Sequence, residues 1–98
     1  MENKWYAIAF KRIYEGKPDY YLTVRCKKKE FDKELEIIER DKYIEKKWII
    51  EDCEKYWQEI DEKVHQIMWR EIDEKTLESK IMEIQNKIKE DAKDKENI

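Results

Sequence analysis

The stretch that decides the fold is KWYAIAFKRIYEGKPDYYLTVRCKK, residues 4–28. Its first part alternates aromatic and β-branched side chains with other residues, as a β-strand does. The only glycine and the only proline of the chain follow, Gly16 and Pro18, and this pair is typical of a turn. Residues 20–28 alternate again, with Leu22 and Val24 on an apolar side and basic residues on the other. The stretch therefore predicts an antiparallel β-hairpin.

Residues 30–50 fit both a helical and a strand period. A two-stranded hairpin is marginally stable by itself, so this stretch must help to cover it. The cover is either a third strand, within 34–39 or 43–50, or a short helix that begins near Asp32. We expect a short helix at 32–40 and an extended segment near 46–50.

From residue 51 onward the pattern is helical, and neither glycine nor proline interrupts it. A first apolar stripe covers one face of a helix and contains Ile49, Ile50, Cys53, Tyr56, Trp57, Ile60, Val64, Ile67 and Met68. A second stripe contains Leu77, Ile81, Ile84 and Ile88, and on a continuous helix it would lie roughly 90–110° around from the first. We therefore expect a break near 73–76, with helices of about 51–72 and 76–91. One unbroken, bent helix is the alternative.

These elements predict an α+β fold: an N-terminal antiparallel hairpin packed on C-terminal helices. A chain of 98 residues has the size of one domain, which we place at 1–91, followed by a frayed, charged tail at 92–98. In this arrangement one hairpin face, formed by Tyr6, Ile8 and Phe10 together with Leu22 and Val24, packs against the first helical stripe.

The composition limits the class of protein. Charged residues make up 48% of the chain and aromatic residues 12%, and the aromatic content favours a folded domain over disorder. Cys26 and Cys53 have no CxxC spacing, which favours reduced thiols and a cytoplasmic location. No apolar run of 18 residues is present, so we expect no membrane span.

The side-chain inventory argues against an enzyme. His65 is the only histidine, and the single glycine excludes glycine-rich phosphate loops. Asp61 lies four residues before His65, but two ligands make a weak metal site. We expect no catalytic residue, no cofactor and no metal.

Charge is sorted along the chain. Residues 1–48 hold 13 basic and 10 acidic side chains (+3), whereas residues 49–98 hold 9 basic and 15 acidic ones (−6). The basic side of the hairpin, within 20–29, is a candidate nucleic-acid contact formed by Tyr21, Arg25, Lys27, Lys28 and Lys29. The alternative is a lysine-rich edge strand that prevents edge-to-edge pairing.

The acidic stretch 51–74, with 9 acidic and 3 basic side chains, is either a solvated helix face or a surface that docks on a basic protein. Trp69 falls opposite the first apolar stripe on the helical wheel, so we expect it to be exposed, unless 31–50 or the last helix covers it. The candidate partner contacts are Trp69, Glu51, Glu62, Asp73 and Glu74.

In size and composition the whole chain resembles the small, acidic, Lys/Glu/Ile-rich anti-defence proteins of phages and mobile elements, anti-CRISPR proteins among them. The resemblance implies a stoichiometric inhibitor with a protein target. From the acidic stretch we expect this target to be the basic surface of a nucleic-acid-handling host protein, met in the host cytoplasm.

Two other functions stay open at this stage. One is a nucleic-acid-binding module that uses the basic hairpin. The other is a homo-oligomeric structural protein that associates through the second stripe, Leu77, Ile81, Ile84 and Ile88.

Overall fold

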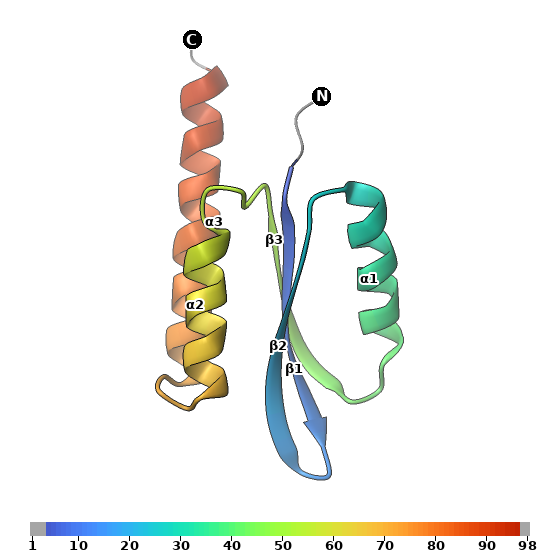
Figure 1. Cartoon of the computed structure of the whole chain (residues 1–98). Helices are drawn as coiled ribbons and strands as arrows, with labels where there is room; N and C mark the ends of the chain where they lie inside the picture. Colours follow the sequence, from blue (N-terminus) through green and yellow to red (C-terminus); the bar gives the residue numbers. More distant parts are fainter. Residues whose placement is uncertain (1–3, 97–98) are drawn as a thin grey trace.

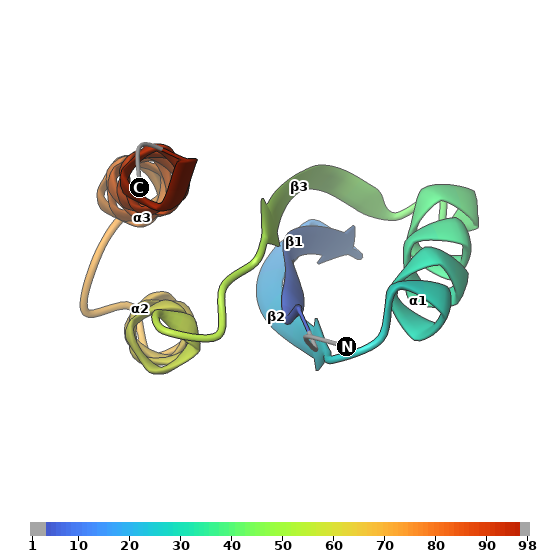
Figure 2. The same ribbon diagram turned by 90° about the horizontal axis from the view of Figure 1, so that it is seen from above.

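A computed structural model of the protein describes residues 4–96, with side chains described as far as Lys93. Its elements are β1 (Tyr6–Tyr14), β2 (Lys17–Arg25), α1 (Lys28–Arg40), β3 (Ile44–Glu51), α2 (Trp57–Met68) and α3 (Glu74–Glu96). The strands form one antiparallel sheet in the order β2-β1-β3. Helix α1 covers one face of this sheet, and α2 and α3 cover the other (Figures 1 and 2). The predicted α+β class is confirmed.

The hairpin is closed by a turn of only two residues, Glu15 and Gly16. Both have positive φ, 51° and 77°, which is the backbone of a type I′ turn. This turn type matches the right-handed twist of the strands, and glycine adopts its conformation without strain. Tyr14 and Lys17 are therefore the closing pair, and β2 begins earlier than the predicted strand.

The ambiguous stretch contains both a helix and a third strand. Helix α1 ends at Arg40, as predicted, but begins at Lys28 because Phe31 is already part of its buried face together with Ile38. Strand β3 pairs with the free side of β1, from Tyr6 opposite Glu51 onward. The expectations of a short helix and then an extended segment are confirmed.

The sheet separates two hydrophobic cores, and here the predicted packing is wrong. Residues directly opposite in an antiparallel pair share a face. Val24 lies opposite Ala7, so Leu22 and Val24 pack with Ala7 and Ala9 against α2 and α3. Tyr6 and Ile8 are on the other face, where they pack against Phe31 and Ile38 of α1. The small alanines let the second layer of helices approach the sheet.

Helix α2 begins six residues later than predicted, at Trp57. Glu51 is still the last residue of β3, and Asp52 takes a positive φ of 61°. The N–H of Cys53 then donates to the carbonyl of Trp5 at 2.9 Å, which fastens the connection to the start of β1. Hydrogen bonding to the sheet thus outweighs the helical period at this point.

The predicted break between the last two helices is confirmed. The N–H of Glu71 donates to the carbonyl of Gln66 at 2.8 Å, and that of Arg70 to Ile67 at 3.0 Å, the Schellman pattern that ends a helix. Asp73 then caps the next helix by accepting from the Thr76 N–H at 2.9 Å. Helix α3 continues to Glu96, beyond the predicted end at 91 and into the predicted tail, of which residues 97–98 lie outside the described part.

The second apolar stripe is part of the core. Leu77, Ile81 and Ile84 are 0%, 1% and 0% exposed, and Ile88 packs partly buried against the same cluster. Their side chains contact the sheet and α2, so the prediction of a homodimer surface formed by Leu77, Ile81, Ile84 and Ile88 is wrong.

Candidate protein-docking surface

The end of α2 presents two large apolar side chains to solvent. Trp69 is 74% exposed and Met68 is 49% exposed, whereas Ile60, Val64 and Ile67 of the same helix are buried in the core. The expected position of Trp69, away from the core, is confirmed. We call residues 68–73, which join α2 to α3, the α2–α3 corner.

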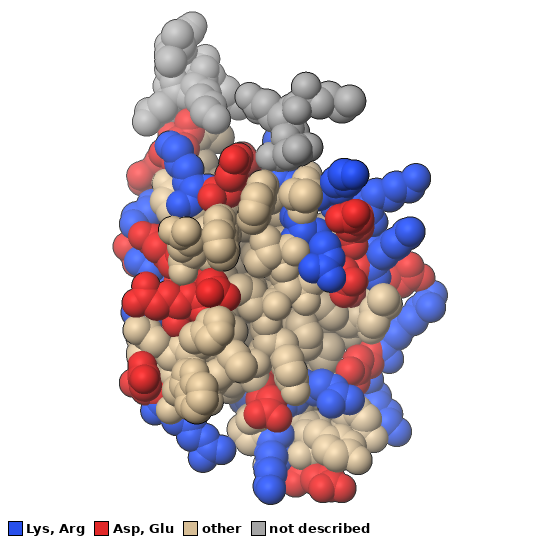
Figure 3. Space-filling view, in the orientation of Figure 1, with Lys and Arg blue, Asp and Glu red and all other residues tan. Residues whose placement is uncertain are grey.

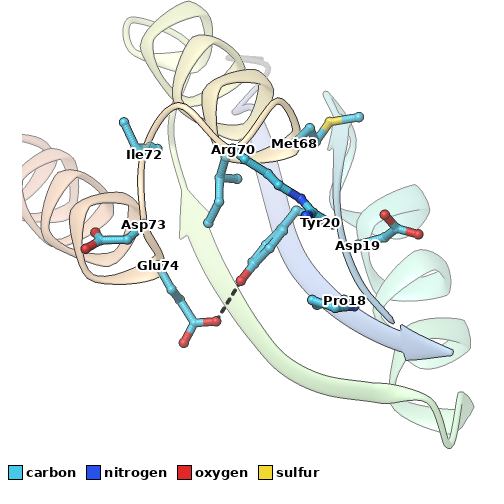
Figure 4. Close-up of a pocket in the computed structure, with 9 residues that line it drawn as sticks. Pro18, Asp19, Tyr20, Met68, Arg70, Ile72, Asp73 and Glu74 are labelled. Atoms are coloured by element: carbon cyan, nitrogen blue, oxygen red, sulfur yellow. Dashed lines mark hydrogen bonds between the residues drawn. The ribbon is translucent and has the colours of Figure 1, made fainter. Parts of the chain in front are cut away.

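A cavity of about 220 Å³ lies between this corner and the start of β2 (Figure 4). It is lined by Pro18, Asp19, Tyr20, Ile67, Met68, Arg70, Ile72, Asp73 and Glu74. Arg70 has a positive φ of 60°, and Figure 4 shows its side chain extending from the corner toward Tyr20. An apolar side chain from outside could fill this space between Ile72 and Tyr20.

Glu74 closes one side of the cavity and is held there by the sheet. The ammonium of Lys11 lies 3.0 Å from its carboxylate, and the Tyr20 hydroxyl donates to it at 2.9 Å. The hydrogen bond from Lys11 is the main reason why the pKa of Glu74 lies below its usual value, and the same bond raises the pKa of Lys11. Burial and this carboxylate raise the pKa of Tyr20.

Of the remaining predicted acidic contacts, only Asp73 belongs to the α2–α3 corner. Asp73 accepts a hydrogen bond from the Thr76 hydroxyl at 2.7 Å, and this bond lowers the pKa of its carboxyl group. Its carboxylate is therefore engaged in capping α3. Glu62 is exposed midway along α2. Glu51 pairs with Tyr6 at the far end of the sheet, because it belongs to β3. The acidic stretch is thus spread along α2 and does not form one cluster.

Three of the candidate nucleic-acid residues already contact other residues of the chain. Tyr21 stacks on Phe10 at a centroid distance of 5.3 Å. Arg25 pairs with Glu34 at 3.2 Å, and Lys28 pairs with Asp32 at 3.0 Å, where a hydrogen bond raises the pKa of Lys28.

Lys27 and Lys29 are exposed. Because β2 ends at Arg25, all three lysines lie beyond the strand, and the alternative of a lysine-protected edge strand is wrong.

The groups considered for chemistry are dispersed. His65 lies 3.5 Å from Asp61, and among the described side chains, residues 4–93, no third metal-binding group joins them. Cys53 is fully buried, which raises the pKa of its thiol to about 11. None of the described helices has the length and apolar character needed to cross a membrane.

Sequence reasoning did not find the outer edge of β2. Figure 3 shows largely uncharged surface in the middle of this face, over β2 and α2, with charged side chains around it. The signal was available in the sequence, since Tyr20-Tyr21-Leu22-Thr23-Val24 carries no charge in a chain that is 48% charged. Its importance depends on the sheet order, which places β2 at an edge.

Comparison with known proteins gives no guide to function: no family model, no curated protein and no solved structure matches the chain. The function has to be argued from this surface. Two features of it point outward, the Trp69 side chain and the uncharged β2 edge.

Proposed function

We propose that the chain is a non-catalytic protein-binding module that docks on its partner through the α2–α3 corner. The observation that carries this proposal is the exposure of Trp69, 74%, next to the half-exposed Met68. The other described tryptophans are mostly covered: Trp48 is buried, and Trp5 and Trp57 stack on one another at 5.9 Å.

Burial of Trp69 in an interface would supply a large part of a binding energy. A tryptophan side chain removes up to about 250 Å² from water, and at roughly 25 cal/mol per Å² the exposed part corresponds to about 3–5 kcal/mol. Tryptophan is also among the residue types most enriched at interface hot spots. The adjoining cavity gives the partner a matching recess for one of its own side chains.

The charge of this half of the molecule suggests a basic partner. Residues 49–98, which include α2 and α3, hold 15 acidic and 9 basic side chains. Such a surface attracts proteins whose own positive surface binds nucleic acid, and it competes with phosphate for that surface. Together with the resemblance to phage anti-defence proteins, this supports a stoichiometric inhibitor of a nucleic-acid-handling host protein, acting in the host cytoplasm.

The docking role is tested with Trp69→Ala, using Met82→Ala as the matched control. Met82 is 58% exposed on the outer side of α3, so its variant also removes an exposed apolar side chain. We expect Trp69→Ala to abolish capture of a partner from host extract, and Met82→Ala to retain it. Both should melt like the unchanged protein, since exposed side chains contribute little to folding. Equal capture by the two variants would refute the docking role of Trp69.

Inhibition is a separate question that needs the captured partner. We expect the protein to block nucleic-acid binding by this partner once equimolar amounts are present, with a sharp end point at a 1:1 ratio. If the partner still binds nucleic acid above that ratio, the chain binds the partner but does not inhibit it.

Direct nucleic-acid binding is the second candidate, favoured by the exposure of Lys27, Lys29 and Tyr21. In that case affinity falls steeply with salt, and reversal of the lysine charges weakens binding to all sequences alike. No shift of single- or double-stranded probes at low salt would dismiss it.

A further inference from the structure

The outer edge of β2 carries backbone groups that the sheet leaves unpaired. In a two-residue hairpin the closing pair exchanges hydrogen bonds across the strands, and the pairs then alternate along the ladder. With Tyr14 opposite Lys17, the N–H groups of residues 19, 21, 23 and 25 point toward β1. Those of Tyr20, Leu22 and Val24 point away from the sheet. Pro18 falls on the same outward side, where its missing N–H costs no ladder bond.

The opposite edge of the sheet is partly occupied. The side-chain amide of Gln85 on α3 donates to the carbonyl of Ile49 in β3 at 2.9 Å. Helix α3 also contacts this strand, so an added strand would compete with the helix there. Among the described residues, the β2 edge meets no such competing side-chain amide.

The middle of the β2 edge lacks the usual protection against pairing. Exposed edges are normally shielded by inward charges, lysines, prolines or bulges. Here Pro18 lies near the start of the strand, and at its end the Arg25 guanidinium donates to the carbonyl of Val24 at 2.8 Å. The five residues between Asp19 and Arg25 carry no charge, and the β1–β2 register runs without a shift. Figure 3 shows this uncharged strip between the charged flanks of the molecule.

The occupant of this edge is a single extended segment and not a second folded copy. Helix α2 packs mainly over β2. Paired strands lie about 4.8 Å apart. If a second copy paired with β2 symmetrically, its α2 would lie about as far from the first α2 as the two strands lie from one another. The axes of packed helices need about 8–10 Å between them. The two helices would collide, but a segment with no helix over it fits.

We propose that the partner protein adds one extended segment, antiparallel, to the outer edge of β2. This inference rests on the protein-binding function proposed above and specifies what the partner contributes. The side chains of the segment that lie opposite Leu22 and Val24 face α2 and are apolar. Near Pro18 and Tyr20, one of them reaches the cavity beside the α2–α3 corner. The segment carries an acidic residue opposite Arg25 and a basic residue opposite Asp19, because unlike charges stabilise directly paired positions.

The test uses a synthetic peptide with the sequence of residues 18–25, PDYYLTVR, as the probe. With Leu22 opposite Leu22, its aspartate meets Arg25 of the protein and its arginine meets Asp19. The control peptide, PRYYLTVD, exchanges these two charges and keeps the composition. We expect the first peptide to protect the amides of Tyr20, Leu22 and Val24 from hydrogen exchange. The exchanged peptide should bind at least about fivefold more weakly, because both paired positions then hold like charges.

Protection at 20, 22 and 24 alone, with residues 19, 21, 23 and 25 unchanged, supports the proposal. Equal binding of the two peptides, or peptide-induced changes confined to other elements, would overturn it.

Partner capture separates this inference from the proposed function. Leu22→Pro removes the central outward N–H without removing a bond to β1. Loss of capture with folded Trp69→Ala but not with folded Leu22→Pro would retain the docking function and reject strand addition. If Leu22→Pro does not fold, the peptide experiment on the unchanged protein decides alone.

Discussion

At the scale of single residues, Arg70 departs from what folding alone would select. It occupies the left-handed position that follows a helix, with φ of 60°, where glycine or asparagine is usual. A residue with a Cβ costs roughly 1–2 kcal/mol in this conformation. Its side chain lines the cavity at the α2–α3 corner, so the sequence keeps a strained arginine at the candidate docking surface.

Arg70→Gly should therefore stabilise the protein while weakening partner capture. Relief of the strain exceeds the extra freedom that glycine gives the unfolded chain, for a net gain of about 0.5–1 kcal/mol. In a domain of this size that raises the melting temperature by about 2–8 °C. A lower melting temperature would show that Arg70 stabilises the corner through contacts that outweigh the strain.

Cys53 and Cys26 should differ sharply in reactivity. With a pKa of about 11 and no exposure, the Cys53 thiol has very little thiolate at pH 8. Cys26 is partly exposed. A thiol reagent should therefore modify one cysteine in the folded protein and both after unfolding. Two rapid equivalents under native conditions would mean that the chain opens readily around the start of α2.

At the scale of elements, the two sides of α3 should respond differently to mutation. Ile84 is fully buried, so Ile84→Ala should lower the free energy of unfolding by about 2–5 kcal/mol. Met82 lies on the outer side of α3, so Met82→Ala should lower the free energy of unfolding only slightly. Chemical denaturation of both variants measures the difference, and comparable stabilities would contradict the packing of α3 on the sheet.

The positions of the strands and helices could be predicted from the sequence better than the way in which these elements pack against one another. Alternation and the Gly16 turn located the hairpin, and the mismatch between two apolar stripes located the break at the α2–α3 corner. Neither pattern could show that β1 is buried on both faces, since Ala7 and Ala9 are weak apolar signals between Tyr6, Ile8 and Phe10. The sequence pattern does not show that a second layer of helices covers Ala7 and Ala9, so the Leu77 stripe has no evident partner within the chain and a dimer stays open as an alternative.

The candidate surface was predicted in part for a similar reason. The exposure of Trp69 follows from the helical wheel, which is a local property. The positions of Glu51 and Glu74 depend on tertiary contacts: hydrogen bonding to β1 keeps Glu51 in a strand, and Lys11 draws Glu74 onto the sheet. Neither of these tertiary interactions can be predicted from the local periodicity of the sequence.

At the scale of the whole molecule, α3 is fastened to the sheet by ion pairs as well as by its apolar face. Glu74 contacts Lys11, and Glu78 pairs with Lys46 and accepts from the Trp48 indole N–H at 3.0 Å. In these pairs, lysines from the more basic first half of the chain attract glutamates of α3, which belongs to the more acidic second half. They make the attachment of α3 dependent on the charge of two carboxylates.

The stability of the protein should therefore decline with acid over a defined range of pH. The hydrogen bonds from Lys11 and Lys46 hold the pKa values of Glu74 and Glu78 below the ordinary value of 4.5. A carboxylate with a lowered pKa in the folded state stabilises the fold fully above its unfolded pKa, and this contribution is lost as the pH falls through the folded pKa. Stability should thus be level above about pH 5 and decline below about pH 4.5.

Glu74→Gln tests the origin of that decline. At pH 7 the variant should lose about 1–2 kcal/mol, because Lys11 and Tyr20 lose a charged partner. Below the folded pKa the carboxyl group of the unchanged protein is neutral as well, so the two stabilities should converge. Urea unfolding at a series of pH values from 7 downward measures the difference at each pH, and Glu54→Gln, at an exposed position before α2, is the control. A stability difference that stays constant while acid lowers the stability of the unchanged protein would show that Glu74 acts through its shape and not through its charge.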